Sequence, residues 1–218
     1  MKTQQANKSE ILANIKNLMK KTEIECSEEQ YDKLATLVEL LAKWNNVLNL
    51  TAIREIDKMV VLHILDSAVV SPLISDKGKN IADVGTGAGF PGLVLAILNP
   101  QKHFTLIDSV AKKLSFVRTA MVSLGLKNVT IINDRCENIK VEHKFDCILS
   151  RAFAPLCKII EWCENLIDDN GLFVAMKANL EEGELNELPE NAEILENIPL
   201  SVPGLDAKRQ AVVMRIKK

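Results

Sequence analysis

From residue 80 onward, short runs rich in β-branched and aliphatic residues alternate with segments of helical periodicity. The runs lie at residues 81–84, 104–107, 129–132, 145–149 and 172–176. Such alternation is typical of βαβ units, whose parallel strands form one sheet and whose helices cover both faces of that sheet. The sequence therefore predicts an α/β fold with a Rossmann-like, mostly parallel sheet.

Two further runs, at residues 192–198 and 211–216, extend this sheet. Between them lie Pro199, Pro203 and Gly204, and no helical pattern connects the two runs. Neighbouring strands joined without a crossover helix are antiparallel, and prolines are tolerated at a sheet edge. We therefore expect seven strands, the last two forming an antiparallel pair at one edge.

Three amphipathic helices precede the sheet. We expect the first at residues 9–21, with Ser9 capping its first turn, and the third at residues 57–70. The second begins at Ser27, which is placed to form a capping box with Gln30. The sequence thus divides into an N-terminal helical extension, residues 1–76, and an α/β domain, residues 77–218, as one compact unit.

Composition and charge narrow the class of protein. The 218 residues are 47% hydrophobic and 26% charged, which is enough for one substantial core. The net charge of −2 gives no overall attraction to a polyanion, so any contact with nucleic acid needs a local basic patch. The apolar stretches are far shorter than the roughly 20 residues of a membrane span, and the polar N-terminus lacks a signal-peptide pattern. We expect a cytoplasmic protein.

Five cysteines are spread along the chain without a Cys-x-x-Cys pair or a nearby histidine at ligand spacing. This pattern supports neither a zinc site nor a disulfide framework. We expect small buried thiols and no metal.

The strongest functional signal is the glycine-rich sequence Asp83-Val84-Gly85-Thr86-Gly87-Ala88-Gly89-Phe90-Pro91-Gly92. It lies between the first expected strand and a helix that Pro91 is well placed to open. Glycines at the carboxyl end of a strand let a ligand lie against bare backbone, although a tight strand-to-helix turn alone also uses them. Phe90 stands where the dinucleotide fingerprint requires its third glycine. The remaining Gly-x-Gly-x-Gly, preceded by an acidic residue, resembles the first motif of class I methyltransferases, which bind S-adenosylmethionine.

Two polar positions follow at the ends of the next strands. Asp108 ends the second strand, where a carboxylate in this topology accepts hydrogen bonds from both ribose hydroxyls. The alternative is that Asp108 caps the helix beginning near Val110, and we favour the ribose. The loop Asp134-Arg135-Cys136-Glu137 follows the third strand, at the position that lies beside the adenine in methyltransferases.

With these motifs in register, the chain resembles the RsmG (GidB) family of bacterial 16S rRNA methyltransferases, which modify N7 of a guanine in the decoding region of the small ribosomal subunit. The resemblance covers most of the chain after residue 43. It runs through Trp44-Asn45-Asn46, Asn49-Leu50-Thr51, His63-Ile64-Leu65-Asp66-Ser67, Gly85 to Gly92, Asp108-Ser109, Lys112, Ser150-Arg151-Ala152-Phe153, Lys177 and Arg209.

The resemblance implies S-adenosylmethionine as cofactor and assigns residues to it and to the rRNA. The implied cofactor contacts are Gly85, Phe90, Asp108, Cys136, Glu137 and Arg151, with Asp83, Gly87 and Gly89 completing the loop. The implied rRNA-facing surface consists of Lys112, Arg135, Lys177 and Arg209. The chain departs from the family pattern at Cys136, Ala178 and Gln210-Ala211, where the family has Ala, Gly and His-Leu. We expect a monomer that acts on the small ribosomal subunit.

The segment after the fourth strand agrees with chemistry that needs no base. Guanine N7 is an unprotonated acceptor, so it can attack the methyl group without prior loss of a proton. Ser150-Arg151-Ala152-Phe153 stands where methyltransferases of amino groups carry Asn/Asp-Pro-Pro-Tyr/Phe. We expect Arg151 and Phe153 to shape the catalytic site, and we interpret His63 and Trp44 as packed residues outside it.

Three other functions remain open at this point. The chain could methylate a small molecule or a protein, it could be a noncatalytic rRNA-binding assembly factor, or it could be a nucleotide-binding oxidoreductase. Phe90 argues against the oxidoreductase because it breaks the dinucleotide fingerprint. The intact glycine loop together with Asp108 argues against a protein that has lost its cofactor.

Overall fold

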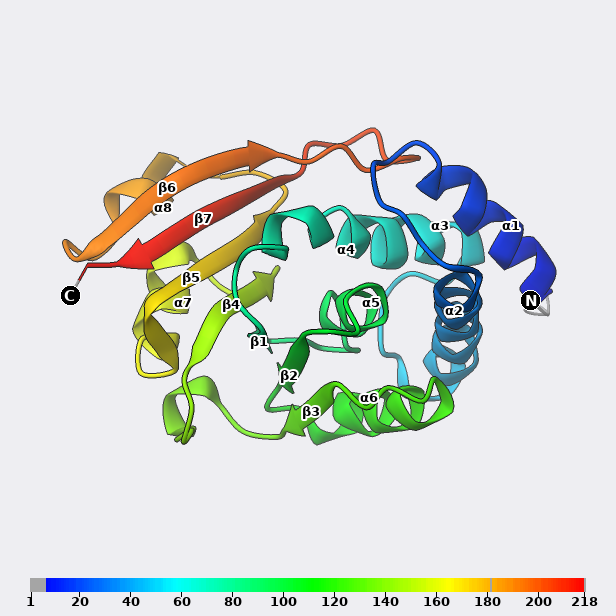
Figure 1. Ribbon diagram of the computed structural model, residues 1–218, viewed down its shortest axis with the longest axis horizontal. Coiled ribbons are helices and arrows are strands. Elements are labelled where there is room, and N and C mark those ends of the chain that lie inside the picture. Colours follow the sequence, from blue (N-terminus) through cyan, green and yellow to red (C-terminus); the bar gives the residue numbers. More distant parts are fainter. Residues whose placement is uncertain (1–6, 181, 218) are drawn as a thin grey trace.

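Seven strands form one sheet in the order β3-β2-β1-β4-β5-β7-β6 in the computed structural model, which describes residues 7–180 and 182–217 (Figure 1). The first five strands run parallel, and β7 is antiparallel to both of its neighbours. The strands are β1 (Asn80–Val84), β2 (His103–Ile107), β3 (Val129–Ile132), β4 (Phe145–Arg151), β5 (Ile167–Lys177), β6 (Ala192–Pro199) and β7 (Gln210–Ile216). The predicted α/β fold and the antiparallel pair at the sheet edge are confirmed.

Helices cover both faces of the sheet, as side chains that alternate along each strand require. In β4, Cys147 and Leu149 join one hydrophobic cluster and Ile148 joins the other. The first cluster packs the sheet against α5 (Gly92–Leu98), α6 (Ala111–Ser123) and the N-terminal helices. The second packs it against α7 (Leu156–Cys163) and the short 3-10 turn η3 (Cys136–Asn138). The small helix α8 (Glu182–Asn186) precedes β6.

The first two helices, α1 (Lys8–Met19) and α2 (Glu28–Leu48), lie at the end of the molecule away from the antiparallel edge (Figure 1). The capping box at the start of α2 is present: Gln30 N donates to Ser27 Oγ at 3.2 Å, and Ser27 N donates to Gln30 Oε1 at 2.8 Å. The predicted Ser9 cap of α1 is wrong. Asn7 caps α1 because its side-chain oxygen accepts from Ser9 N at 3.0 Å.

The third helical run changes its winding along its length. It comprises α3 (Ile56–Met59), a π-helical turn η1 (Val60–Leu65) and α4 (Asp66–Ala68), followed by the 3-10 turn η2 (Ser71–Ile74). A π-helical turn is wider than an α-helical one, and such turns are frequent at functional sites. The sequence predicted a single regular helix here, because the apolar spacing of an α-helix and that of a π-turn differ too little to be distinguished.

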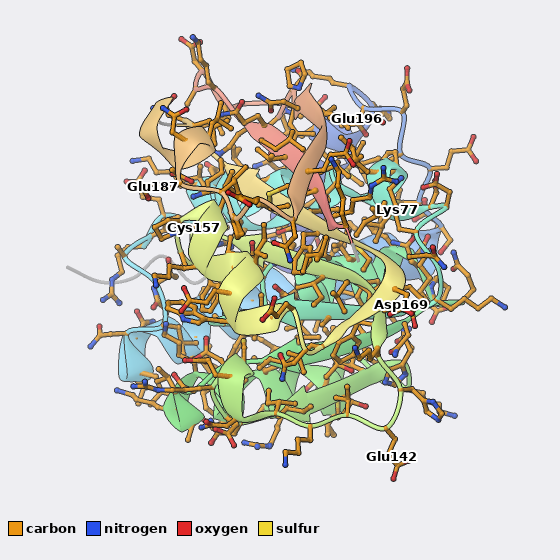
Figure 2. All side chains as sticks on the ribbon, turned by 90° about the vertical axis from the view of Figure 1, so that its left-hand side faces the viewer. Lys77, Glu142, Cys157, Asp169, Glu187 and Glu196 are labelled. Carbon is orange, nitrogen blue, oxygen red and sulfur yellow. The ribbon has the colours of Figure 1, made fainter. Side chains whose placement is uncertain are left out.

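Exposed charged side chains of both signs cover the end of the molecule formed by α7, α8 and β6. Figure 2 shows this end, where Glu142, Asp169, Glu187 and Glu196 are labelled, and the exposed basic residues there include Lys158 and Arg215. Among the described residues, no helix is both long and apolar enough to cross a membrane.

Candidate active site

The glycine loop follows β1 and turns back over the end of the sheet. Gly85, Gly87 and Gly89 all have positive φ, between 59° and 86°. At Gly85 an added Cβ would lie 2.1 Å from the ring of Phe153, so neither its backbone conformation nor its surroundings accept a side chain. At Gly87 an added Cβ would meet only the Lys113 ammonium, at 4.0 Å. The loop thus presents the backbone of Gly87 to open space.

Asp83, in β1, fixes this loop by hydrogen bonds. Its Oδ2 accepts hydrogen bonds from Thr86 Oγ1 at 2.6 Å and from Gly92 N at 2.8 Å. Burial raises the pKa of the fully buried Asp83 carboxyl to about 6. Asp83 lines neither of the two cavities described below. The structure therefore gives it a role in fixing the loop, whereas the sequence placed it among the cofactor contacts.

Two adjoining cavities, each of about 480 Å³, lie at the carboxyl ends of the parallel strands. They share Gly85, Lys113 and Ala152 as lining residues. We call the first the Asp108 cavity; its walls also include Ser109, Asp134, Arg135, Cys136, Glu137, Phe153 and Trp162. We call the second the Arg151 cavity; its walls also include Thr51, His63, Asp66, Gly87, Phe90, Met176, Lys177 and Arg209.

Asp108 joins the glycine loop to the start of α6. Its Oδ2 accepts from Gly87 N and its Oδ1 accepts from Val110 N, both at 2.8 Å. The N-cap of α6 is Val110 and it has no side-chain cap hydrogen bond, so Asp108 joins the backbone before the helix to the glycine loop instead of capping the helix itself. The carboxylate also lines the Asp108 cavity, where the expected ribose contact would lie, and that contact stays a prediction.

An aromatic wall closes the other side of the Asp108 cavity. Phe153 and Trp162 meet edge to face, with ring centroids 5.7 Å apart. The 3-10 turn η3 contributes the buried Cys136 and the exposed Glu137 to the lining of the same cavity. The structure thus brings three expected cofactor contacts, Asp108, Cys136 and Glu137, to one cavity together with Phe153, which was expected in the catalytic site. Trp162 was missed, because its place on α7 carries no motif.

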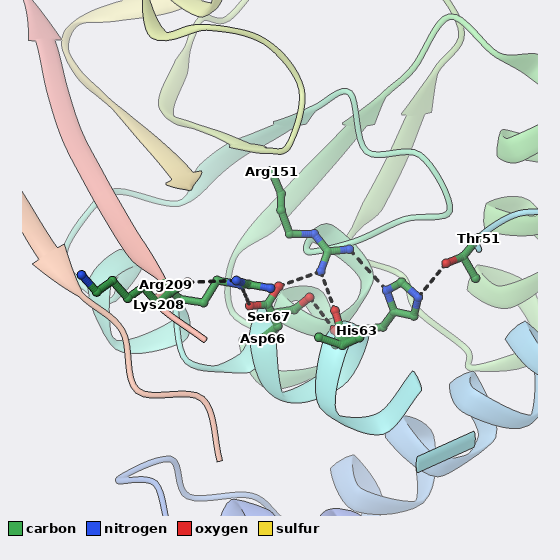
Figure 3. Close-up of polar contacts among 8 residues, drawn as sticks. Thr51, His63, Asp66, Ser67, Arg151, Lys208 and Arg209 are labelled. Atoms are coloured by element: carbon green, nitrogen blue, oxygen red, sulfur yellow. Dashed lines mark hydrogen bonds and ion pairs between the residues drawn. The ribbon is translucent and has the colours of Figure 1, made fainter. Parts of the chain in front are cut away.

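The Arg151 cavity contains a carboxylate shared by two arginines (Figure 3). Asp66 Oδ2 accepts from Arg151 Nη1, and Asp66 Oδ1 accepts from Arg209 Nε, both at 3.0 Å. Arg151 Nη1 also donates to the carbonyl oxygen of Leu62 at 2.9 Å, within the π-helical turn. Its guanidinium group lies over the ring of Phe90, 5.7 Å from the centroid. Arg151 is therefore fixed on several sides.

His63 belongs to the same wall. Its ring stacks on Phe90 with centroids 4.8 Å apart, and its Nε2 lies 3.2 Å from Thr51 Oγ1 (Figure 3). Burial and the nearby Arg151 charge lower the pKa of His63 to about 3, so the imidazole is neutral near pH 7. The predicted packing and hydrogen bonding of His63 are confirmed. His63 also lines the Arg151 cavity, whereas the sequence led us to place it outside the catalytic site.

The four predicted basic residues occupy different environments. Arg209 and Lys177 line the Arg151 cavity, and Arg135 lines the Asp108 cavity. Lys177 forms a partly buried ion pair with Glu184, 2.8 Å away, and also donates to Ala154 O at 3.0 Å. Lys112 is exposed and lines neither cavity, whereas Lys113 lines both.

Comparison with known proteins identifies the family. The sequence profile described as "rRNA small subunit methyltransferase G" (GidB) matches residues 30–213. The chain belongs to this family. It is 46% identical over 205 residues to "Ribosomal RNA small subunit methyltransferase G" from Psychromonas ingrahamii, covering 94% of this chain and 98% of that protein. It is also 46% identical over 203 residues to the protein of the same name from Haemophilus influenzae, covering 93% and 99%.

Solved structures of low sequence identity show the same fold. An S-adenosylmethionine-dependent methyltransferase from Clostridium acetobutylicum superposes with a TM-score of 0.57 at 12% identity, covering 74% of this chain and 96% of that one. TrmN from Thermus thermophilus superposes with a TM-score of 0.54 at 18% identity, covering 69% and 48%. This member of the methyltransferase G family thus has the fold of a class I methyltransferase.

The aromatic wall provides a direct test of cofactor binding. The chain has two tryptophans, and Trp44 packs on Phe116 with centroids 6.0 Å apart, as expected of a core residue. In a Trp44→Phe variant, adding S-adenosylhomocysteine should change the fluorescence of Trp162 saturably, because the ligand would displace water from the indole. A Trp162→Phe variant should bind the ligand with no saturable change. The opposite pattern would remove Trp162 from the cofactor site.

Proposed function

We propose that this protein transfers the methyl group of S-adenosylmethionine to N7 of a guanine in the decoding region of 16S rRNA, in the cytoplasm. The observation that carries the proposal is the junction of the two cavities at Gly85 and Ala152. A cofactor in the Asp108 cavity can reach the boundary from one side, and a base in the Arg151 cavity can reach it from the other.

The residues present fit the cofactor. Each carboxylate oxygen of Asp108 accepts one backbone hydrogen bond and can accept a second from a ribose hydroxyl. The rings of Phe153 and Trp162 offer an apolar surface to the adenine. The open backbone at Gly87 leaves room for the ligand beside the loop. Ala152, at the junction, has a φ of 49°, a conformation that non-glycine residues rarely adopt. Ala152 lines both cavities, so the side chain at their junction is only a methyl group.

Positioning is the main work of the protein in this reaction. S-adenosylmethionine, when bound, supplies an electrophilic methyl group on a sulfonium. The neutral His63 and the Asp66-bound Arg151 form a fixed wall beside Phe90, which can hold a planar base in line with that methyl. N7 needs no proton removed before it attacks. Because its pKa is lowered to about 3, His63 is a poor general base near pH 7, which agrees with a reaction that needs none.

Unpaired cations at the cavity wall favour RNA over a small molecule or a protein as the acceptor. Lys113 and Arg135 line the Asp108 cavity together with the acidic Asp134 and Glu137, and neither basic side chain has a partner among the described residues. A protein with a net charge of −2 can bind a polyanion only through such a local surface. The names of the relatives, which specify ribosomal RNA, agree with this preference.

Methyl transfer from labelled S-adenosylmethionine tests the proposal. The acceptors are small subunits from cells that lack this methyltransferase, naked 16S rRNA and total protein from the same cells. We expect label in one guanine of the 16S rRNA, converted by borohydride and aniline into a strand break that is specific for N7-methylguanine. Incorporation only into protein, or into no acceptor, would overturn the proposal.

A further inference from the structure

Helix α6 begins with two adjacent lysines that face different surroundings. Lys112 is exposed outside the cavities, whereas the half-buried Lys113 lines both of them. The Lys113 ammonium lies over the glycine loop, since it is the atom that a Cβ on Gly87 would meet at 4.0 Å. Lys113 is thus the cation located where the two cavities join.

Lys113 also differs from the other cations of the Arg151 cavity in its ion pairing. Arg151 and Arg209 share the buried Asp66, and Lys177 is paired with Glu184. The side chain of Lys113 has no ion pair or hydrogen bond within residues 7–180 and 182–217. An ammonium held at a cavity boundary without a carboxylate partner is available to an anionic ligand.

We propose that Lys113 binds a backbone phosphate of the RNA strand that delivers the target guanine. This inference rests on the proposed function and adds a specific contact to it. Arg135 lines the Asp108 cavity beside Lys113, is exposed, and has no side-chain partner among the described residues either. The carboxylates of Asp134 and Glu137 flank Arg135 in this wall, so Lys113, at the junction of the two cavities, is the cation best placed for a phosphate that crosses the mouth. The paired Arg151 and Arg209 remain for the base itself.

A phosphate fits Lys113 better than the carboxylate of the cofactor does. The cofactor carries a positive sulfonium, and the shared position of Lys113 places its ammonium near the boundary where the methyl must be transferred. Two like charges at such a boundary repel each other unless an anion lies between or beside them. A phosphate of the incoming strand supplies that negative charge only when the substrate is bound.

The test compares Lys113→Gln with Arg118→Gln, a control at an exposed residue of the same helix that lines neither cavity. Binding of transcribed 16S rRNA is measured across a series of KCl concentrations, and binding of S-adenosylhomocysteine by calorimetry. For Lys113→Gln we expect roughly tenfold weaker RNA binding near 0.1 M salt and a salt slope smaller by about one. S-adenosylhomocysteine affinity should be unchanged, Lys113→Arg should restore RNA binding, and Arg118→Gln should behave as wild type.

Several results would overturn the inference. Unchanged RNA affinity and salt slope in Lys113→Gln would remove the phosphate contact, and weaker S-adenosylhomocysteine binding with unchanged RNA binding would assign Lys113 to the cofactor carboxylate. In both cases the wild-type enzyme still methylates rRNA, so the proposed function survives. If the wild type binds S-adenosylhomocysteine but neither binds nor methylates 16S rRNA, the proposed function fails, and the inference about Lys113 fails with it.

Discussion

Replacement of Asp66 by Ala should lower the free energy of unfolding by about 3 kcal/mol and abolish methyl transfer. Asp66 has 6% of its side chain exposed and neutralises two arginines whose side chains are 18% and 21% exposed. Removing the carboxylate leaves two guanidinium groups close together in a poorly hydrated wall. Thermal or urea unfolding measures the change in stability.

A matched control is Glu193→Ala, which breaks the ion pair of Glu193 with Arg215 at the sheet edge. The nitrogen–oxygen distance of the Glu193–Arg215 pair, 2.8 Å, is close to the 3.0 Å of the Asp66–Arg151 pair. The side chains of Glu193 and Arg215 are 32% and 51% exposed, however, so water already screens their attraction. Its loss should cost less than about 1 kcal/mol. Equal destabilisation by the two substitutions would show that Asp66 has no special role.

The Asp66→Asn variant separates positioning from folding. Asparagine keeps the shape of the side chain but carries no charge and has only one oxygen to accept the hydrogen bonds of two arginines. We expect a folded protein with normal S-adenosylhomocysteine affinity and with kcat on small subunits reduced by about a hundredfold, since Arg151 and Arg209 lose their fixed geometry. Turnover equal to that of the wild type would assign Asp66 a purely structural role.

The sheet could be predicted from sequence because its pattern is local. Alternating apolar runs, the glycine turn and the Ser27 capping box each depend on residues that are close in the chain, and each appears where expected. The edge pair β6–β7 was likewise encoded locally, by the prolines that replace a crossover helix. Ser9 failed as a cap for a local reason too: Asn7 offers the same chemistry two residues earlier.

The wall of the Arg151 cavity could not be predicted in the same way. Asp66 lies in the motif of residues 63–67, which the family resemblance includes. Its partners, however, are Arg151 and Arg209, which are distant along the chain. Their meeting depends on how the N-terminal helices pack across the strand ends. His63 enters the wall through the π-helical turn, whose winding the apolar spacing does not reveal.

The two lysines of α6 show how small a rotation decides a role. Adjacent residues on an α-helix point in directions about 100° apart, so Lys112 and Lys113 cannot both face the cavities. The family resemblance implied an rRNA contact at Lys112, and this stays a prediction. Which of the two lysines reaches the cavities depends on the rotation of α6 about its own axis, which is set by the packing of Leu114, Phe116 and Val117 in the core.

Asp108→Ala should weaken the binding of S-adenosylmethionine by roughly 1.5 to 3 kcal/mol, which corresponds to about a tenfold to a hundredfold loss of affinity. One part of the loss comes from the ribose hydroxyls, which would no longer have a charged acceptor. The structure adds a second part: Gly87 N and Val110 N lose the oxygens that hold them, so the glycine loop and the start of α6 are no longer joined.

Calorimetry with S-adenosylhomocysteine measures this affinity, and the exposed Asp206, which lines neither cavity, provides the control substitution Asp206→Ala. Asp108→Asn should fall between wild type and Asp108→Ala, because an amide oxygen can still accept from one of the two backbone amides but carries no charge for the ribose. An affinity of Asp108→Ala equal to that of the wild type would mean that the carboxylate serves only the backbone of the glycine loop and of the segment before α6.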